Sequence, residues 1–179
     1  MLLPGKAASK DVWLTRSEAA RLIRAAWRAK QIFRNTATQR DVGKHVARFI
    51  LVGLYTGTRH AAICGAAFHS AIGRGYVDLE RGVFYRRAQG ARETKKRKPP
   101  IRPNGRLLSH LRRWQRLGIS VRSVIEWNHK PVRSVRKGFA TAVRAATGLF
   151  KLPTRALRTV RPGAGCLGSA HIRERVSAK

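Results

Sequence analysis

Acidic side chains are scarce in this sequence of 179 residues. Only 8 aspartates and glutamates stand against 39 lysines and arginines, which gives a formal net charge of +31. Self-repulsion on that scale opposes a compact fold unless a polyanion neutralises it. Nucleic acid is the expected partner, because each neutralised phosphate releases a counterion and adds affinity. The excess is spread along the chain, which suits an extended phosphate-binding surface. A high-GC coding bias toward arginine would raise the count without any function.

Cysteine, long apolar runs and metal-ligand patterns are scarce as well. Cys64 and Cys166 are too few and too isolated for a disulfide scaffold or a zinc site, so a reducing compartment is expected. No apolar run approaches the roughly 20 residues that span a bilayer, and residues 1–6 do not resemble a secretory signal. The histidines have no metal-ligand spacing. We therefore expect no membrane, metal, cofactor or small-molecule substrate, and a cytoplasmic, nucleoid-associated location.

A hydrophobic content of 43% predicts one domain with a real core. Its expected class is α+β, mostly helical with a small three-stranded antiparallel sheet. Residues 31–43 are predicted to form a connection, and Trp27 and Trp114 occupy core-like helical positions. Apolar periodicity predicts helices over residues 15–30, 44–56, 59–68, 107–118 and 132–147. Strands are predicted at 76–79, at 83–86 and, confined to an edge by neighbouring prolines, near Ile101.

The junction Tyr55-Thr56-Gly57-Thr58-Arg59 carries the most information. An apolar helix runs directly into Gly57, which permits a sharp turn that a residue with a Cβ would resist. Arg59 is then expected at the start of a new helix, where a guanidinium can bind a phosphate with two hydrogen bonds. A helix-ending glycine followed by a surface arginine is the simpler alternative.

This junction resembles the first arginine box of the tyrosine recombinases, the phage-integrase family. The resemblance covers about residues 13 to 147, in the order helix, helix, short helix, antiparallel strands, helix, helix. It implies an N-terminal extension at 1–12, a partial integrase-like catalytic domain at 13–148 and an aberrant basic tail at 149–179 that is expected to be poorly ordered. The family's DNA-clamping N-terminal domain is missing from this sequence.

Members of the family attack a DNA phosphodiester with a tyrosine hydroxyl and need no metal. Two arginines stabilise the charge that develops on the phosphate oxygens. The resemblance assigns Arg59 to the first arginine, although Ala62 stands where the family has an acid. Arg158 matches the second arginine, with Arg155 in place of a histidine. An arginine cannot accept a proton at neutral pH, so Arg155 is no general base.

The segment Thr94-Lys95-Lys96-Arg97-Lys98 matches the family's catalytic-lysine loop in position and composition. Lys95 and Lys96 remain equal candidates for that lysine, and Arg97 and Lys98 would contact DNA beside them. The alternative is a basic loop that only touches the DNA backbone. The loop has no interleaved aromatic residues, so it gives little sign of base stacking on single strands.

The nucleophile has no counterpart in this sequence. Tyr55, Tyr76 and Tyr85 all fall in predicted core helix or strand, and Ser177 occupies the place expected for the tyrosine. Covalent catalysis fails without its nucleophile. The resemblance therefore implies a catalytically inactive, truncated or frameshifted relative that retains affinity for duplex DNA, with full-length integrase protomers as a second candidate partner.

Additional DNA-backbone contacts are assigned to Arg133, Arg136 and Lys137 at the start of the last predicted helix, where a solvated charged face is the alternative. Two other functions compete with this interpretation. One is a general basic protein that binds RNA or ribosomes. The other is a mobile-element remnant without a stable product.

Overall fold

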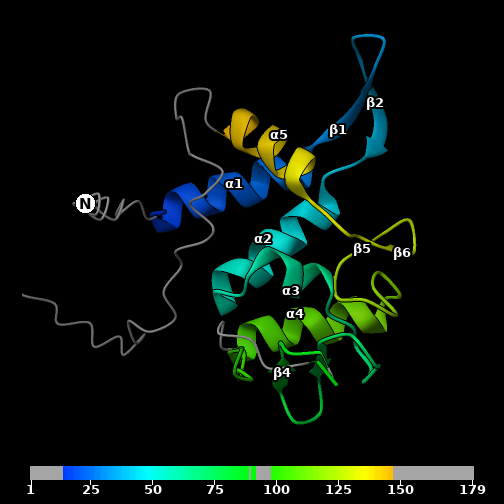
Figure 1. The fold of residues 1–179 in the computed structure, drawn as a ribbon. Helices are drawn as coiled ribbons and strands as arrows, with labels where there is room; N and C mark the ends of the chain where they lie inside the picture. Colours follow the sequence, from blue (N-terminus) through cyan, green and yellow to red (C-terminus); the bar gives the residue numbers. More distant parts are fainter. Residues whose placement is uncertain (1–13, 89, 92–97, 147–179) are drawn as a thin grey trace, which may run out of the picture.

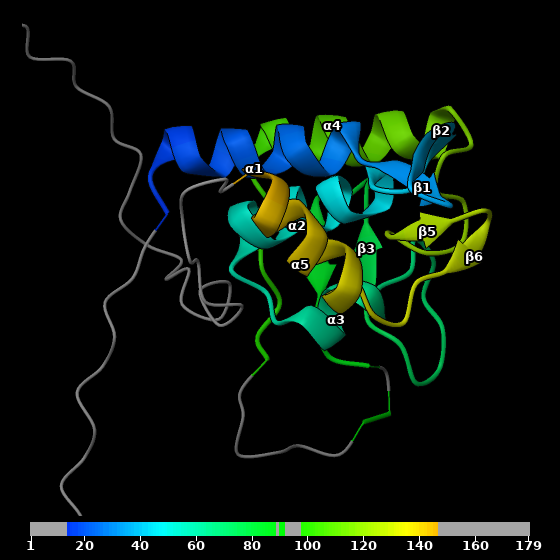
Figure 2. The same ribbon diagram turned by 90° about the horizontal axis from the view of Figure 1, so that it is seen from above.

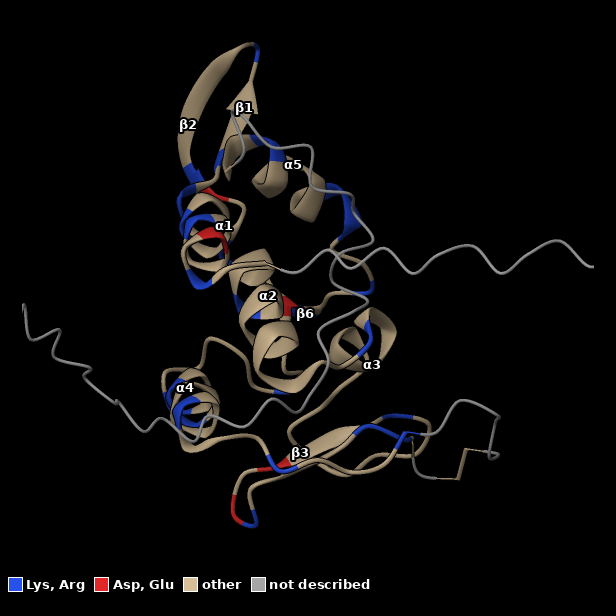
Figure 3. Ribbon diagram, turned by 90° about the vertical axis from the view of Figure 1, so that its left-hand side faces the viewer, with Lys and Arg blue, Asp and Glu red and all other residues tan. Residues whose placement is uncertain are grey.

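The computed structural model describes residues 14–88, 90–91 and 98–146. Within them, α2 runs through the middle of the domain, with α1 and α5 on one side and α3, α4 and the β3–β4 hairpin on the other (Figures 1 and 3). The class is α+β, as predicted. The elements are α1 (Arg16–Arg28), β1 (Lys30–Phe33), β2 (Thr36–Asp41), α2 (Lys44–Thr56), α3 (His60–Cys64), β3 (Tyr76–Asp78), β4 (Val83–Tyr85), α4 (Gly105–Arg116), β5 (Glu126–Trp127), β6 (Lys130–Pro131) and α5 (Arg136–Ala146).

Helix α1 begins with a capping box. The Thr15 hydroxyl accepts a hydrogen bond from the Glu18 backbone N–H at 3.3 Å, and the Glu18 carboxylate accepts one from the Thr15 N–H at 2.8 Å. These bonds satisfy two backbone donors that the first helical turn would otherwise leave free. The hydrogen bond from the Thr15 backbone is also the main cause that lowers the pKa of Glu18. Leu22 and Ala26 then fix the buried face of the helix.

Helix α2 supplies much of the core, and its close neighbours require glycine. Val46, Ile50 and Val52 are almost fully buried, and α1 and α5 pack against this region and each other. A Cβ on Gly43 would lie 2.0 Å from the Ala26 carbonyl oxygen, and one on Gly138 would lie 2.6 Å from Val46 Cγ2. The three helices can therefore approach this closely only because these two positions lack a side chain.

Arg48 is a buried charge on α2 with a structural role. The residue is 8% exposed, and its guanidinium donates to the Ile119 carbonyl at 3.4 Å and the Ser120 hydroxyl at 3.1 Å. Burial lowers its pKa, and the nearby Glu126 carboxylate acts in the opposite direction. These bonds hold the segment that follows α4 against α2, so Arg48 is not available to a ligand.

The β3–β4 hairpin is confirmed, whereas the predicted third strand is not a strand. Tyr76 pairs with Tyr85, and Gly82 takes the positive φ of 63° that the turn requires. Ile101 forms a single antiparallel bridge to Phe84, with N···O distances of 2.8 and 3.1 Å. Pro99 and Pro100, which lack N–H donors, precede Ile101, so pairing does not extend in that direction.

Two further hairpins replace predicted irregular structure. The prediction of a connection over 31–43 is wrong, because β1 and β2 pair antiparallel across a turn formed by Arg34 and Asn35. The last predicted helix begins at Arg136 instead of 132, because β6 and a short link to α5 occupy residues 130–135. The β1–β2 and β5–β6 hairpins lie at the same end of the domain (Figure 2).

The predicted burial of three aromatic residues is correct for one of them and wrong for two. Trp114 is buried, with 6% of its surface exposed, as its helical position predicted. The core assignment of Trp27 is wrong, because 49% of its surface is exposed and the Lys44 ammonium lies 5.7 Å from its ring centroid. Tyr55 is 37% exposed, so its placement in the core is wrong as well. Both residues lie on the solvent edge of an otherwise buried helical face.

Candidate nucleic-acid interface

Arg59 stands on a rigid turn between α2 and α3. Gly57 ends α2 in the left-handed conformation with φ of 58°, and its N–H donates to the Gly53 carbonyl at 2.8 Å. The buried Thr56 hydroxyl donates to the Val52 carbonyl at 2.7 Å and accepts from the Thr58 N–H at 3.2 Å. These bonds fix the backbone up to Arg59, which is the N-cap residue of α3 and has an exposed side chain. The predicted position of this arginine at the start of a helix is confirmed.

A second arginine, Arg86, lies close to Arg59. It follows β4, and its Nε donates to the Pro99 carbonyl at 2.8 Å. Burial lowers the pKa of Arg86, and the nearby positive charge of Arg59 lowers it further. Neither arginine has an ion-pair partner in the described part of the chain. Two arginines whose charges act on each other, with no ion-paired carboxylate among the described residues, favour the binding of an anion such as phosphate.

Helix α5 begins beside the same region. The His60 Nε2 accepts a hydrogen bond from the Val135 N–H at 3.4 Å, and the imidazole packs edge-on against Phe49 with ring centroids 5.3 Å apart. Burial lowers the pKa of His60, and the charge of Arg136 lowers it further. His60 is therefore neutral at pH 7, and it ties the first turn of α5 to α3. The first residue of α5, Arg136, is consequently near α3, although the helix itself packs against α1.

Lys98 is next to this region along the chain. It is exposed and directly precedes Pro99, whose carbonyl accepts the Arg86 hydrogen bond. We call Arg59, Arg86, Lys98 and Arg136 the α3 basic cluster. Arg86 was absent from the predicted site, because the proximity of a strand end to a helix start more than 25 positions earlier leaves no periodic signal in the sequence.

The remaining predicted site residues are distributed as follows. Arg133 and Lys137 are exposed and line a groove beside β6 and α5 rather than the α3 basic cluster. Lys95, Lys96, Arg97 and Arg158 lie outside the described residues. Figure 3 shows lysine and arginine on α1, on α4 and along the β3–β4 side of the domain, which agrees with an extended basic surface.

Most acidic groups in the described residues are engaged locally and do not neutralise this cluster. Asp41 forms ion pairs with Lys30 and Lys44 at 2.6 and 2.5 Å. Asp78 accepts backbone hydrogen bonds in the β3–β4 turn. The buried Glu126 carboxylate accepts three backbone N–H groups, from residues 121, 122 and 123. The excess positive charge is therefore left to be balanced by an external anion.

The described part of the chain contains neither a metal-binding group of side chains nor a reactive cysteine thiol. It contains no group of three histidine, cysteine or acidic side chains placed to hold a metal. Cys64 is buried, and burial raises the pKa of its thiol to about 11, so the thiol is protonated at neutral pH. Cys64 is therefore a small packing residue of the core. No helix there is both long and apolar enough to cross a bilayer.

Comparison with known proteins gives no relative for this chain. No protein-family model, no curated protein and no solved structure matches it. The case for a function therefore depends on the charge, position and contacts of the residues themselves.

Proposed function

We propose that this chain is a duplex-DNA-binding protein of the tyrosine-recombinase type that does not cleave DNA. The observation that supports this most strongly is the placement of Arg59, exposed on a rigid turn near Arg86, with no carboxylate of the described residues ion-paired to either. Such a pair is suited to a backbone phosphate, because two planar guanidinium groups can each donate two hydrogen bonds to its oxygens.

The binding is expected to follow the DNA backbone rather than the base sequence. Lys98 and Arg136, the other two members of the α3 basic cluster, are exposed and can contact neighbouring phosphates. Phosphate contacts fix the position of a protein on a duplex and carry no sequence information. The proposed role is thus attachment to duplex DNA, and a full-length integrase protomer on the same DNA is a proposed neighbour.

Absence of cleavage follows from the tyrosines of this sequence. Tyr76 and Tyr85 stack on each other across the β3–β4 hairpin with ring centroids 4.6 Å apart, and Tyr55 lies on α2 before the turn. All three precede the α4–α5 half of the domain, whereas the family's nucleophile follows its second arginine. The proposal therefore assigns the α3 basic cluster to phosphate binding alone.

Equilibrium binding to a fluorescent duplex tests this proposal. Arg59→Ala is expected to weaken binding about 5- to 30-fold, which is the effect of losing a charge-assisted contact worth about 1–2 kcal/mol. Arg24→Ala is the matched control, since Arg24 is an exposed α1 arginine and α1 lies on the other side of α2 from α3 (Figure 3). Equal loss in both variants would contradict a defined site. Stronger binding to a structured RNA, unaffected by Arg59→Ala, would favour the general RNA-binding alternative.

A nicked duplex suicide substrate tests the second half of the proposal. We expect retention of the DNA without a covalent protein–DNA adduct that survives denaturation. An adduct would overturn the assignment and require a nucleophile other than a C-terminal tyrosine.

A further inference from the structure

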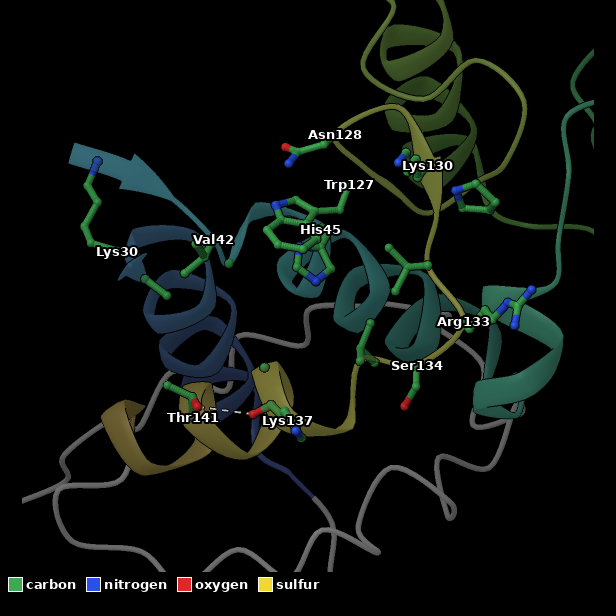
Figure 4. Close-up of a pocket in the computed structure, with 16 residues that line it drawn as sticks. Lys30, Val42, His45, Trp127, Asn128, Lys130, Arg133, Ser134, Lys137 and Thr141 are labelled. Atoms are coloured by element: carbon green, nitrogen blue, oxygen red, sulfur yellow. Dashed lines mark hydrogen bonds between the residues drawn. The ribbon is translucent and has the colours of Figure 1, made fainter. Parts of the chain in front are cut away.

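A groove separate from the α3 basic cluster lies between the start of α2, the β5–β6 hairpin and the start of α5 (Figure 4). Its volume is about 830 Å³, within the range of small-molecule sites. Its lining includes the apolar residues Val42, Val132 and Val135. The groove can therefore hold a flat apolar group of the size of a nucleobase together with its sugar.

One side of this groove presents aromatic surface. The Trp127 indole is 42% exposed and lies with its centroid 5.5 Å from the His45 imidazole. Burial lowers the pKa of His45, and the charge of Arg48 lowers it further, so the imidazole is neutral at pH 7. The Arg40 guanidinium lies 5.9 Å from the indole centroid. An indole beside a neutral imidazole and a guanidinium is a surface on which a base can stack.

The other side carries cations. Lys130, Arg133 and Lys137 are exposed and line the groove, and none has an ion-pair partner among residues that the structure describes. In Figure 4, Lys130 and Arg133 lie to one side of Trp127 and His45, and Lys137 lies below them on α5. Of the described residues that line the groove, none is acidic. The groove therefore offers an aromatic platform with Lys130 beside it and with Arg133 and Lys137 further away.

The aromatic platform is held by a tight turn. Asn128 and His129 both have positive φ, 51° and 56°, which is the geometry of a two-residue turn whose twist matches its flanking strands. This turn fixes Trp127 opposite Lys130 in the β5–β6 pair. It also places the Asn128 amide, which has both donor and acceptor atoms, at the groove next to the indole.

We propose that this groove, the Trp127 groove, binds one unpaired nucleotide of a DNA strand, with the base stacked on Trp127 and its phosphate held by Lys130, Arg133 and Lys137. The inference deepens the proposed function, since it names a DNA ligand for a second site of the same protein. A nucleotide satisfies both sides of the groove, because it joins a flat ring to an anion. A simple anion would leave the aromatic platform unused, and an apolar ligand would leave three cations without a partner.

The test compares two labelled duplexes, one fully paired and one with a single extrahelical adenosine nucleotide. We expect the second to bind about 5- to 100-fold more tightly, from the range of base–aromatic stacking energies. Trp127→Ala should abolish this preference and leave affinity for the paired duplex unchanged, whereas Trp127→Phe should retain most of it. Arg59→Ala should weaken both duplexes equally. Equal affinity of the unaltered protein for the two duplexes would overturn the proposal.

Free dAMP separates failure of this inference from failure of duplex binding. Saturable quenching of tryptophan fluorescence by dAMP, lost in Trp127→Ala and weakened in Lys137→Gln, would support the groove even if the paired duplex does not bind. Binding of the paired duplex without preference for the unpaired nucleotide and without a Trp127-dependent response to dAMP would refute the groove and leave the proposed function intact. Circular dichroism of each variant excludes loss of the fold as the cause.

Discussion

The contact between α1 and α2 at Gly43 allows a sharp prediction about stability. A Cβ at this position would lie 2.0 Å from the Ala26 carbonyl oxygen and 2.7 Å from Ala29 Cβ. The first neighbour is backbone in the last turn of α1 and cannot rotate away. Gly43→Ala must therefore push α1 away from α2, in a region where α1 also packs against α5.

Three contributions determine how much Gly43→Ala lowers the free energy of unfolding. Overpacking of this kind costs about 1–3 kcal/mol or more. Alanine is also a poorer N-cap than glycine, which adds roughly 0.5 kcal/mol. Alanine also reduces the conformational freedom of the unfolded chain, which offsets about 0.4–1 kcal/mol of this loss of stability. The expected net loss of about 0.5–3 kcal/mol lowers Tm by roughly 1–12 °C for a protein of this size.

Thermal unfolding followed by circular dichroism measures this loss, and Gly105→Ala is its matched control. Gly105 begins α4, and a Cβ there meets no atom within 4 Å. The control should be neutral or more stable by up to about 1 kcal/mol. Equal Tm values for Gly43→Ala and the unaltered protein would refute the described packing of α1 on α2.

Three further predictions concern single groups. Burial lowers the pKa of His45 and His60 below the value of about 6.5 expected for the unfolded chain, which therefore binds more protons as pH falls below 7. The contribution of these histidines to the free energy of unfolding should be fully present above pH 7 and be lost on acidification, and the loss should be less steep in His45→Gln. Urea unfolding at several pH values measures this free energy. A steeper loss in the variant would contradict a lowered pKa for His45. In a Cys166→Ser background, the Cys64 thiol, whose pKa is raised to about 11, should react with a disulfide reagent at pH 7.5 only after denaturation; rapid reaction of the folded protein would show that this site is open. His129→Gly should raise stability by about 0.5–1 kcal/mol, because glycine adopts its positive φ without strain; a lower Tm would mean that the imidazole has a contact of its own.

Helix bounds and turns that depend on neighbouring residues could be predicted from the sequence. The capping box of Thr15 and Glu18 marks the start of α1, and the apolar run before Gly57 gives both bounds of α2. Gly57 also locates Arg59, because a left-handed residue after a buried helix forces the chain to turn. The position of Arg59 after this turn could therefore be predicted without a structure.

The two missed hairpins lacked the usual turn signal. Arg34 and Asn35 form one turn and Asn128 and His129 the other, all with positive φ and none of them glycine. Asparagine and histidine adopt this conformation more often than most residues and arginine seldom does, but neither pair contains the glycine that usually indicates a two-residue hairpin turn. The Trp127 groove was missed as a consequence, because its aromatic side depends on the second turn.

Long-range proximity was the other source of error. Arg59 and Arg86 approach each other because β4 ends near the start of α3, and no periodicity within either segment encodes that distance. The single bridge of Ile101 likewise depends on how far pairing extends past Pro100, which β propensity alone does not determine.

The salt dependence of duplex-DNA affinity tests the central claim most directly. Four phosphate contacts by the α3 basic cluster alone would give a slope of log K against log salt of about −3.6, and other cations would make it steeper. The double variant Arg59→Ala, Arg86→Ala is expected to reduce the magnitude of that slope by about 1.8, corresponding to two lost phosphate contacts. An unchanged slope in the double variant would show that the cluster does not contact DNA and would contradict the account.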